Sequence, residues 1–336
     1  DSVDQRTAGK FGECLVAALE AGAVPAREDG TPDPFHAATD GRLAYVANYI
    51  AREATAAGMQ VLAIAGPSDS GKTTLVERLA ERLADRGRVA TVKHLRTEPT
   101  LDTEGKDTAR HRGAGAAVTY GITDDGAWFA TGEERSLPET LDELAARYDY
   151  ALVEGYSGAA LPTVALGGRD HDGETVATAP EADAVDLDSV VEAVEGLDPY
   201  ESLPSLVAEV KASPDAEYAG AIATFTGRVR AKEGPDDEPT EYLEFEKYDG
   251  VAEQRFATIR EELEARDGVQ EVRMHHRTGV VEAGEDIVFV VVLAGHRGEA
   301  FETVEDGIDR LKDEVPLFKK EVTVEETFWS HERPEP

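Results

Sequence analysis

Residues 66–74 constrain the fold of this chain more than any other stretch, because they read Gly-Pro-Ser-Asp-Ser-Gly-Lys-Thr-Thr. This run fits the P-loop pattern G-x-x-x-x-G-K-[ST], whose backbone N–H groups surround phosphate oxygens. The apolar run 61–65 before it predicts a buried strand. Leucines every four residues from 75 to 83, followed by Gly87, predict a helix and its end. We therefore expect a strand, a phosphate-binding loop and a helix, in this order.

The residue types of the loop have defined roles in such sites. Lys72 is expected to reach the outer phosphates and Thr73 to bind Mg²⁺. Further on, an apolar strand at 150–153 ends in Glu154, an arrangement that turns the acid towards Mg²⁺. No N-K-x-D sequence is present, so the pattern alone does not specify guanine. The predicted nucleotide-binding residues are Gly66, Ser68, Ser70, Gly71, Lys72, Thr73 and Thr74, and the predicted metal ligands are Thr73 and Glu154.

The charge balance narrows the possible partners. The chain has 336 residues, which favours two domains, and carries 69 acidic against 34 basic residues, a net charge of −35. The acids are dispersed, so we interpret them as a solvated acidic surface of the kind found in a salt-rich cytoplasm. An acidic mesophilic enzyme is the alternative. Such a surface disfavours nucleic acid as a partner, because phosphate binding needs a basic face.

Cysteine content and hydrophobic runs bear on the compartment. Cys14 is the only cysteine, so the chain has neither a disulfide framework nor a cysteine-based zinc site. The apolar run 287–294 is far too short to cross a membrane and predicts a buried strand. No signal peptide is visible in the sequence. We expect a cytoplasmic protein without a membrane partner.

Three regions differ in pattern. Residues 1–58 contain two helical stretches, 11–21 and 43–57, and are interpreted as a helical extension of unknown role. Residues 59–196 alternate strands and helices, which predicts an α/β domain with a mainly parallel sheet and flanking helices. Within it, residues 102–115 concentrate Lys, Arg and His. They form either an anion site near the strand ends or a solvated basic helix face.

The second half has a different order of elements. After a boundary at 197–199, two helices and several strands that do not alternate predict an α+β domain over 200–336. One helix carries Phe256, Ile259 and Leu263 on one face, and a longer one carries Phe301, Val304, Ile308 and Leu311. The predicted strands are 221–229, 241–248, 269–276, 279–282 and 286–294.

Basic residues gather in this acidic second half. Taken singly, each is a surface charge, and Lys312 in the last turn of its helix also suits the helix dipole. Taken together, they predict a pocket for an anionic substrate. The residues are Arg230, Arg273, His275, His276, Arg277, His296, Arg297, Lys312, Lys319 and Lys320.

Residues 59–195 resemble the molybdopterin-guanine dinucleotide biosynthesis adapter proteins, a GTP-binding P-loop family. The resemblance rests on the P-loop, on Val92-Lys93-His94, and on the segments 105–116 and 152–156. It implies binding of GTP with Mg²⁺, support for guanine dinucleotide cofactor formation, and the guanylyltransferase of the pathway as a partner. The chain departs from the family where 95–97 replace further histidines, and where Thr163 replaces a lysine after Pro162.

Residues 200–330 resemble the large, catalytic subunit of molybdopterin synthase. The matching segments are 221–230, 275–279, 295–301 and 311–321, with Phe318 where the family often has Trp. The resemblance implies conversion of cyclic pyranopterin monophosphate to molybdopterin. It also implies a homodimer of large subunits, each with a small ubiquitin-like subunit whose C-terminal Gly-Gly end carries sulfur as a thiocarboxylate.

The resemblance also implies roles for the basic residues. Lys312 would lie beside the incoming thiocarboxylate, and Lys319 would assist at the pterin. Arg230, His296 and Arg297 would hold the substrate phosphate. Two other functions stay open at this point. One is a P-loop GTPase or kinase with a regulatory C-terminal domain, and the other is a GTP-binding adapter without enzymatic activity.

Overall fold

The computed structural model describes residues 58–97, 106–232, 234–235, 237–247, 250–323 and 327–329. Contacts divide the chain into two compact units. The first is Asp1–His94 with Tyr148–Pro199, and the second is Leu95–Arg147 with Tyr200–Pro336. The helices predicted at 11–21 and 43–57 lie outside the described residues. The domain limits 1–58, 59–196 and 200–336 remain predictions.

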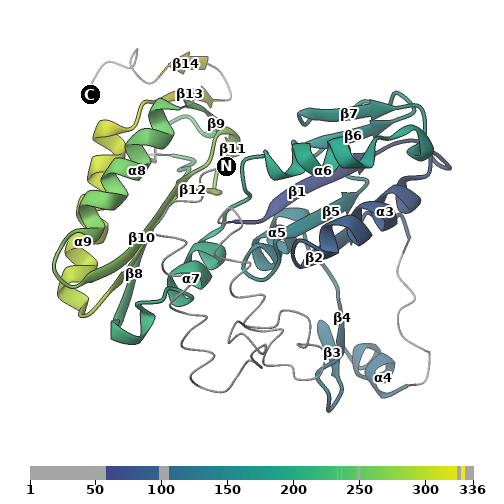
Figure 1. Cartoon of the computed structure of the whole chain (residues 1–336), viewed down its shortest axis with the longest axis horizontal. Coiled ribbons are helices and arrows are strands. Elements are labelled where there is room, and N and C mark those ends of the chain that lie inside the picture. Colours follow the sequence, from purple (N-terminus) through teal and green to yellow (C-terminus); the bar gives the residue numbers. More distant parts are fainter. Residues whose placement is uncertain are drawn as a thin grey trace, which may run out of the picture. The chain divides into compact units, whose positions relative to one another are not determined.

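The first unit is built on a five-stranded parallel sheet with the strand order β2-β5-β1-β6-β7 (Figure 1). The predicted parallel sheet with flanking helices is therefore confirmed. Because the strands are parallel, their carboxyl ends meet at one edge of the sheet. The elements are β1 (Gln60–Ala65), α3 (Lys72–Ala84), β2 (Val89–Lys93), β5 (Tyr150–Glu154), β6 (Thr163–Leu166), β7 (Thr175–Ala179), the 3₁₀ turn η1 (Ala182–Ala184) and α6 (Leu187–Glu195).

The core of this unit follows from the spacing of its apolar residues. Leu62 and Ile64 project from the same face of β1, because alternate residues of a strand share a face. Leu75 and Leu79 of α3, four residues apart, and Val190 of α6 are buried in the same cluster. The two helices therefore cover one face of the sheet.

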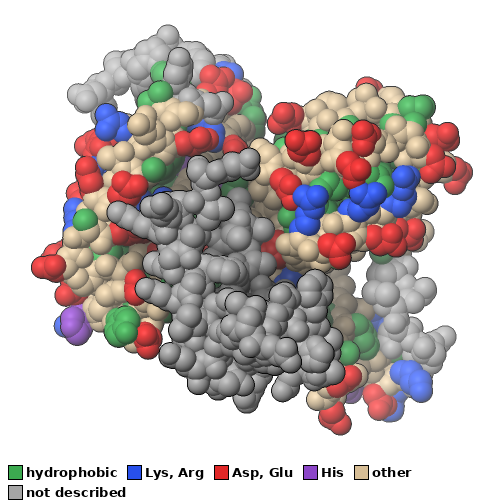
Figure 2. Space-filling view, viewed as in Figure 1, with side chains coloured by type: hydrophobic (Ala, Val, Ile, Leu, Met, Phe, Trp, Pro, Cys, Tyr) green, Lys and Arg blue, Asp and Glu red, His purple; other side chains and the backbone are tan. Residues whose placement is uncertain are grey.

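Charged residues join α3 to the segment that contains η1 and α6. Three arginines spaced four residues apart, two on α3 and one just after its end, each pair with an acid of that segment, and Figure 2 shows basic side chains flanked by acidic ones in this region. Exposed pairs of this kind contribute little to stability, because water and salt screen them. The pairs are Arg78 with Asp183 at 3.4 Å, Arg82 with Asp188, and Arg86 with Glu195.

The second unit contains an antiparallel hairpin that interrupts the alternation predicted for 59–196. The hairpin is formed by β3 (Val118–Ile122) and β4 (Trp128–Gly132), and it follows the short helix α4 (Asp107–Gly113). Its signal is present in the sequence. Every second residue of β3 is apolar, and the turn after it contains Gly126 with φ +87°. Helix α5 (Leu137–Ala145) completes this part of the unit.

The rest of the second unit has the predicted α+β composition. Two antiparallel sheets have the strand orders β10-β12-β8 and β11-β9-β13-β14 (Figure 1). The predicted strands and both predicted helices are confirmed, with bounds shifted by a few residues at most. The elements are α7 (Leu203–Lys211), η2 (Ala216–Tyr218), β8 (Ala221–Arg228), β9 (Thr240–Lys247), α8 (Val251–Glu264), β10 (Val269–His276), β11 (Gly279–Glu282), β12 (Asp286–Ala294), α9 (Arg297–Glu314), β13 (Leu317–Thr323) and β14 (Thr327–Trp329).

The central strand β12 is apolar throughout because both of its faces are covered. Val290 and Val292 are buried in a cluster with residues of α8 and α9. Phe289, Val291 and Leu293, on the opposite face, are buried against α7. A strand covered on both sides needs apolar residues at every position, which explains the unbroken run seen in the sequence.

One predicted core residue of α9 is wrong. Phe301 is 65% exposed, whereas its neighbour Ala300 is buried. The buried face of the helix includes Ala300, Thr303 and Gly307 besides the later apolar residues, so Phe301, about 100° round the helix from Ala300, lies at the edge of that face. Ala300 lies four residues before Val304 and Phe301 lies three before it, so helical spacing fits either as the core residue. The structure buries the smaller one.

Helix α5 packs on α7 although the two are almost sixty residues apart in the sequence. The Tyr200 hydroxyl donates to Asp142 Oδ1 at 2.8 Å, and the Ser202 hydroxyl donates to the Asp142 backbone carbonyl at 3.1 Å. Burial raises the pKa of Asp142 above its usual range. These contacts place residues 137–145 in the second unit. Within the described ranges, every helix is too short or too polar to span a lipid bilayer.

Candidate functional site

The P-loop lies between β1 and α3, as the sequence predicts. A Cβ atom at Gly66 would lie 2.5 Å from Ser70 Oγ and 3.0 Å from Leu166 Cβ, so only glycine fits there. Gly71, the N-cap of α3, has φ +85°, which side chains rarely adopt. The loop therefore folds back tightly on the helix N-terminus, where backbone N–H groups favour an anion.

Polar side chains of the loop are held by its own carbonyl groups. Lys72 Nζ donates to the carbonyl oxygens of Gly66 at 2.9 Å and Pro67 at 2.6 Å, and Ser70 Oγ donates to the Pro67 oxygen at 3.0 Å. Ser68 and Thr74 are exposed. The ammonium group of Lys72 thus lies over the loop that would hold the phosphates.

The two predicted metal ligands are brought together. Thr73 Oγ1 lies 3.0 and 3.1 Å from the two carboxylate oxygens of Glu154 and donates a hydrogen bond to that group. Glu154 is buried at the end of β5, which pairs with β1. Mg²⁺ prefers oxygen ligands and binds through one or two side chains together with substrate phosphates. The hydroxyl and carboxylate therefore fit Mg²⁺. In the described part of the chain, no cluster of three or more His, Cys, Asp or Glu residues could hold a metal.

Lys93 is a residue of this site that sequence reasoning missed. Its Nζ atom lies 3.0 Å from Glu154 Oε1 and 3.1 Å from Thr73 Oγ1. Lys93 ends β2 and stands opposite Glu154 in the register of the two parallel strands. The sequence showed that Lys93 ends a predicted strand, where ligands of such sheets bind, but not that this strand lies beside β5.

His94 and Tyr156 lie next to this group. Their ring centroids are 4.7 Å apart. Gly155 has φ +95°, and a Cβ atom there would lie 2.8 Å from His94 Cβ, so glycine allows the two segments to approach. Tyr156 itself has φ +53°, which is uncommon for a residue with a side chain. The chain after β5 is therefore bent sharply at the carboxyl edge of the sheet.

The basic segment predicted at 102–115 is only partly described. Its residues 107–113 form α4, in which Arg110 pairs with Asp107 at 3.4 Å and both Arg110 and His111 are exposed. This helix belongs to the second compact unit. Whether it forms an anion site or a solvated basic face stays a prediction.

In the second unit, Lys312 occupies the last turn of α9. Its side chain is exposed, and its Nζ atom lies 5.9 Å from the centroid of the Phe225 ring on β8. Arg230 is exposed and follows the end of the same strand by two residues. Lys319 is half-buried on β13, with its Nζ atom 3.9 Å from Glu321 Oε2. Lys312 therefore lies beside the middle of β8, and Arg230 follows the carboxyl end of the same strand.

His296 and Arg297 lie at the other end of α9. His296 is the N-cap residue, Arg297 is the first helical residue, and both are exposed. Lys312 comes 15 residues after Arg297, which is about 22 Å along the helix axis at 1.5 Å per residue. The structure therefore does not bring the predicted phosphate-binding pair of one chain to its predicted catalytic lysine.

Comparison with known proteins supports a fusion of two parts. Residues 61–188 match the family "Molybdopterin guanine dinucleotide synthesis protein B" (MobB), and residues 200–314 match the family "MoaE protein". A probable molybdopterin synthase of Haloferax volcanii is 57% identical over 275 residues, covering 82% of this chain and 100% of that protein. The chain belongs to the molybdopterin synthase family.

More distant relatives match one part each. The molybdopterin synthase catalytic subunit of Caulobacter vibrioides is 40% identical over 113 residues, covering 34% of this chain and 73% of that protein. The crystal structure of Bacillus subtilis MobB is 26% identical with a TM-score of 0.32, covering 41% of this chain and 100% of that structure. The predicted fusion of a MobB-like and a synthase-like part is confirmed, and this family member is an enzyme of molybdenum cofactor biosynthesis.

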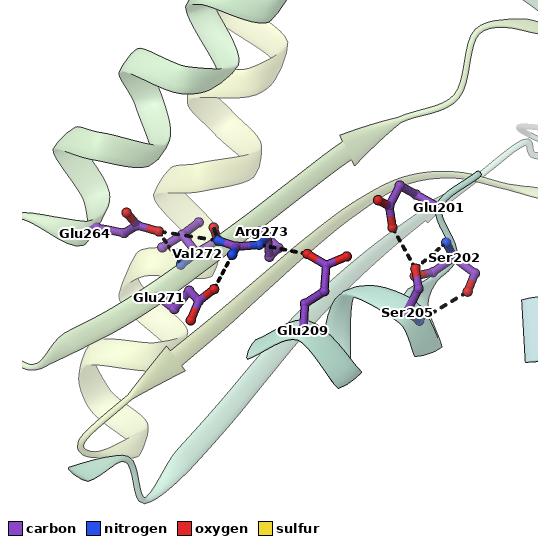
Figure 3. A network of polar contacts seen from close by, with 8 residues as sticks. All are labelled: Glu201, Ser202, Ser205, Glu209, Glu264, Glu271, Val272 and Arg273. Atoms are coloured by element: carbon purple, nitrogen blue, oxygen red, sulfur yellow. Dashed lines mark hydrogen bonds and ion pairs between the residues drawn. The ribbon is translucent and has the colours of Figure 1, made fainter. Parts of the chain in front are cut away.

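Two arginines of the basic group predicted from sequence are paired with acids in this synthase-family chain. Arg273 lies between three carboxylates (Figure 3), with Nε 2.9 Å from Glu209 Oε2 and Nη1 3.8 Å from Glu264 Oε1, and it also pairs with Glu271. Arg277 Nη1 lies 3.4 Å from Glu285 Oε2 and donates to the Asp286 carbonyl at 3.0 Å. Both arginines therefore link parts of the fold.

His276, another member of that group, is not a cationic ligand in this fold. Its ring lies edge-on against Phe245, with the centroids 4.7 Å apart, and its Nδ1–H donates to the Arg277 carbonyl at 2.7 Å. Burial lowers the pKa of His276 below its usual range. His276 is thus a neutral packing residue, and the basic side chains left for an anion are fewer than the sequence suggested.

Glu201, beside the Arg273 group, titrates near neutral pH. It accepts a hydrogen bond from Ser205 Oγ at 2.7 Å (Figure 3). Burial, with the nearby charge of Glu209, raises the pKa of Glu201 from its ordinary 4.5 to about 7. The folded protein therefore binds this proton more tightly than the unfolded chain does. The resulting stabilisation is complete below pH 4.5 and is lost as the pH rises through 7.

Glu201→Gln should therefore stabilise the protein at pH 8 and change little at pH 4.5. The amide cannot ionise, and it keeps an oxygen that can accept from Ser205. We expect a gain of about 2 kcal/mol at pH 8, since each pKa unit corresponds to about 1.4 kcal/mol and partial exposure reduces the effect. Thermal melts of both proteins at the two pH values measure the difference. An equal change in melting temperature at both pH values would contradict the assignment.

Proposed function

We propose that the second unit makes molybdopterin from cyclic pyranopterin monophosphate. The thiocarboxylated C-terminus of a small ubiquitin-like subunit would supply the sulfur, and water would supply the oxygen with which that C-terminus leaves as a carboxylate. The observation that carries this proposal is the exposed Lys312 at the end of α9, beside Phe225 of β8, the strand that Arg230 follows. An ammonium group there suits an anionic thiocarboxylate, and Lys319 on β13 is the second cation that we assign to the reaction.

We further propose that each active site takes residues from two copies of the chain. The pathway substrate is a small molecule, and about 22 Å separates Arg297 from Lys312 along α9. A single chain therefore does not offer both to one substrate. A homodimer, which the family resemblance implies, can bring His296 and Arg297 of one copy to Lys312 of the other.

Mixing two inactive variants tests the shared site. Lys312→Ala and Arg297→Ala should each be inactive as pure proteins. After the subunits are exchanged, half of the dimers are mixed, and one of the two sites in each mixed dimer is intact. When the mixture is supplied with pyranopterin and thiocarboxylated partner, we expect it to make molybdopterin at about a quarter of the parental rate. A control mixture of Lys312→Ala with Lys312→Met should stay inactive. No recovery in mixtures whose subunits have exchanged would refute the shared site.

For the first unit we propose binding of GTP with Mg²⁺. The loop residues 66–74 would surround the phosphates, with Lys72 on the outer phosphates and Thr73 and Glu154 at the metal. Bound Mg²⁺ would neutralise phosphate charge. We expect slow hydrolysis at most, because no catalytic arginine or glutamine is assigned. By this reading the unit supports guanine dinucleotide cofactor formation, with the guanylyltransferase of the pathway as partner, in the cytoplasm of a salt-adapted cell.

A further inference from the structure

Lys93 holds a position in the phosphate-binding site that a metal ion would compete for. Its ammonium nitrogen lies 3.1 Å from Thr73 Oγ1 and 3.0 Å from Glu154 Oε1, the two groups that fit Mg²⁺. The three residues come from different elements. Lys93 ends β2, Thr73 lies in the first turn of α3, and Glu154 ends β5. Lys93 and Glu154 are therefore held next to each other by the pairing of β2 with β5 in the parallel sheet.

Lys93 and a metal ion would bind the same two groups. The Thr73 hydroxyl donates its single proton to the Glu154 carboxylate and accepts from Lys93. A metal ion bound to Thr73 would use the remaining lone pair of the same oxygen. It would also bring two positive charges within a few ångströms of the ammonium group, which costs free energy in a partly buried site. Metal binding and the Lys93 contacts therefore oppose each other.

Burial explains why the carboxylate needs a counter-charge. The Glu154 side chain is 11% exposed, and an unpaired buried carboxylate is unfavourable. It would also repel the phosphates of a nucleotide. The Lys93 side chain, by contrast, is 51% exposed and long enough to swing into solvent. The lysine can therefore neutralise Glu154 when no metal is bound and leave when one arrives.

We propose that Lys93 is the built-in counter-ion of Glu154 and sets the metal dependence of nucleotide binding. This inference rests on the proposed binding of GTP by the loop. With Lys93 in place, the Lys93–Glu154 pair beside the phosphates has no net charge and does not repel them, so the chain binds nucleotide without metal. The same lysine opposes Mg²⁺, so the metal improves binding only modestly. Without Lys93, phosphates meet the bare carboxylate, and binding depends on Mg²⁺.

Calorimetry with GTP in EDTA and in Mg²⁺ tests this directly. The quantity is the ratio of the two dissociation constants, that in EDTA divided by that in Mg²⁺. We expect Lys93→Met to raise this ratio about tenfold or more, because one unpaired charge faces the phosphates. Lys93→Arg keeps the charge and should stay within about threefold of the parent. Lys211→Ala, which removes an exposed lysine at the end of α7, is the control and should match the parent.

A double variant tests the pairing itself. In Lys93→Met with Glu154→Gln neither charge remains, so the metal dependence should fall back below that of Lys93→Met. If Lys93→Met alone does not fold, recovery of a normal melt in the double variant supports the pairing, and failure to recover overturns it. Equal ratios in parent and Lys93→Met, with both binding GTP, also overturn it. If the folded parent binds no GTP in either buffer, the proposed function of the loop is what fails.

Discussion

Replacing Lys312 with alanine should abolish sulfur transfer and leave the protein folded. Lys312 is exposed in the last turn of α9, and alanine is the best helix former, so the helix loses little. The contact of its ammonium group with the Phe225 ring, at 5.9 Å, accounts for about 0.5–1 kcal/mol at most. The loss of a positive charge beside a thiocarboxylate, however, removes an interaction that the reaction needs. Single-turnover molybdopterin synthesis with thiocarboxylated partner, beside a thermal melt, measures both effects.

Lys312→Arg separates two roles of the same residue. Arginine keeps the charge but does not readily deprotonate. If Lys312 only neutralises the thiocarboxylate, arginine should retain part of the rate. If Lys312 moves a proton, arginine should be as inactive as alanine. Glu305→Ala removes an exposed charge from the same helix and should leave the rate unchanged. A folded Lys312→Ala protein with the parental rate would remove Lys312 from the active site.

Lys72→Ala should weaken GTP binding by about a hundredfold, since two charge-assisted contacts to phosphates are worth about 3 kcal/mol together. In the free protein the ammonium group donates to the carbonyls of Gly66 and Pro67. The variant loses these contacts too, so we expect a slightly lower melting temperature. Calorimetry against GTP with Mg²⁺ gives the affinity.

Arg82→Ala is the matched control for Lys72→Ala, because it also removes one positive charge from α3. Arg82 pairs with Asp188 of α6, away from the loop. Its removal should leave the affinity for GTP within about twofold of the parent, because exposed pairs contribute little. Unchanged affinity in Lys72→Ala itself would mean that the loop does not bind nucleotide phosphates in the proposed way.

The strongest periodic signals of the sequence predicted the fold well. The P-loop with its flanking strand and helix, and the unbroken apolar run of β12, both follow from burial at known spacings. The choice between Ala300 and Phe301 failed because spacing alone does not distinguish neighbouring residues on a helix. The core accepts the small side chain and leaves the large one exposed.

The side-chain partners were harder to predict than the elements. Thr73 and Glu154 could be paired in advance, because the P-loop and the acid after a strand have a fixed relation. Lys93 could not be placed without the strand order, which puts β2 next to β5. Arg273 looked like an anion ligand by charge alone, and only the fold reveals the three acids around it.

The contact of α5 with α7 affects how this gene can be divided. A stop codon at Pro199 and a new start at Tyr200 would give two polypeptides that match the two families. The downstream product would carry Tyr200 and Ser202, whereas Asp142, which both hydroxyls contact, would be on the upstream one. The contacts between α5 and α7 would then run between two polypeptides. We therefore expect the downstream product to fold fully only when both products are co-expressed. The two products should then remain associated, because α5 of one packs on α7 of the other.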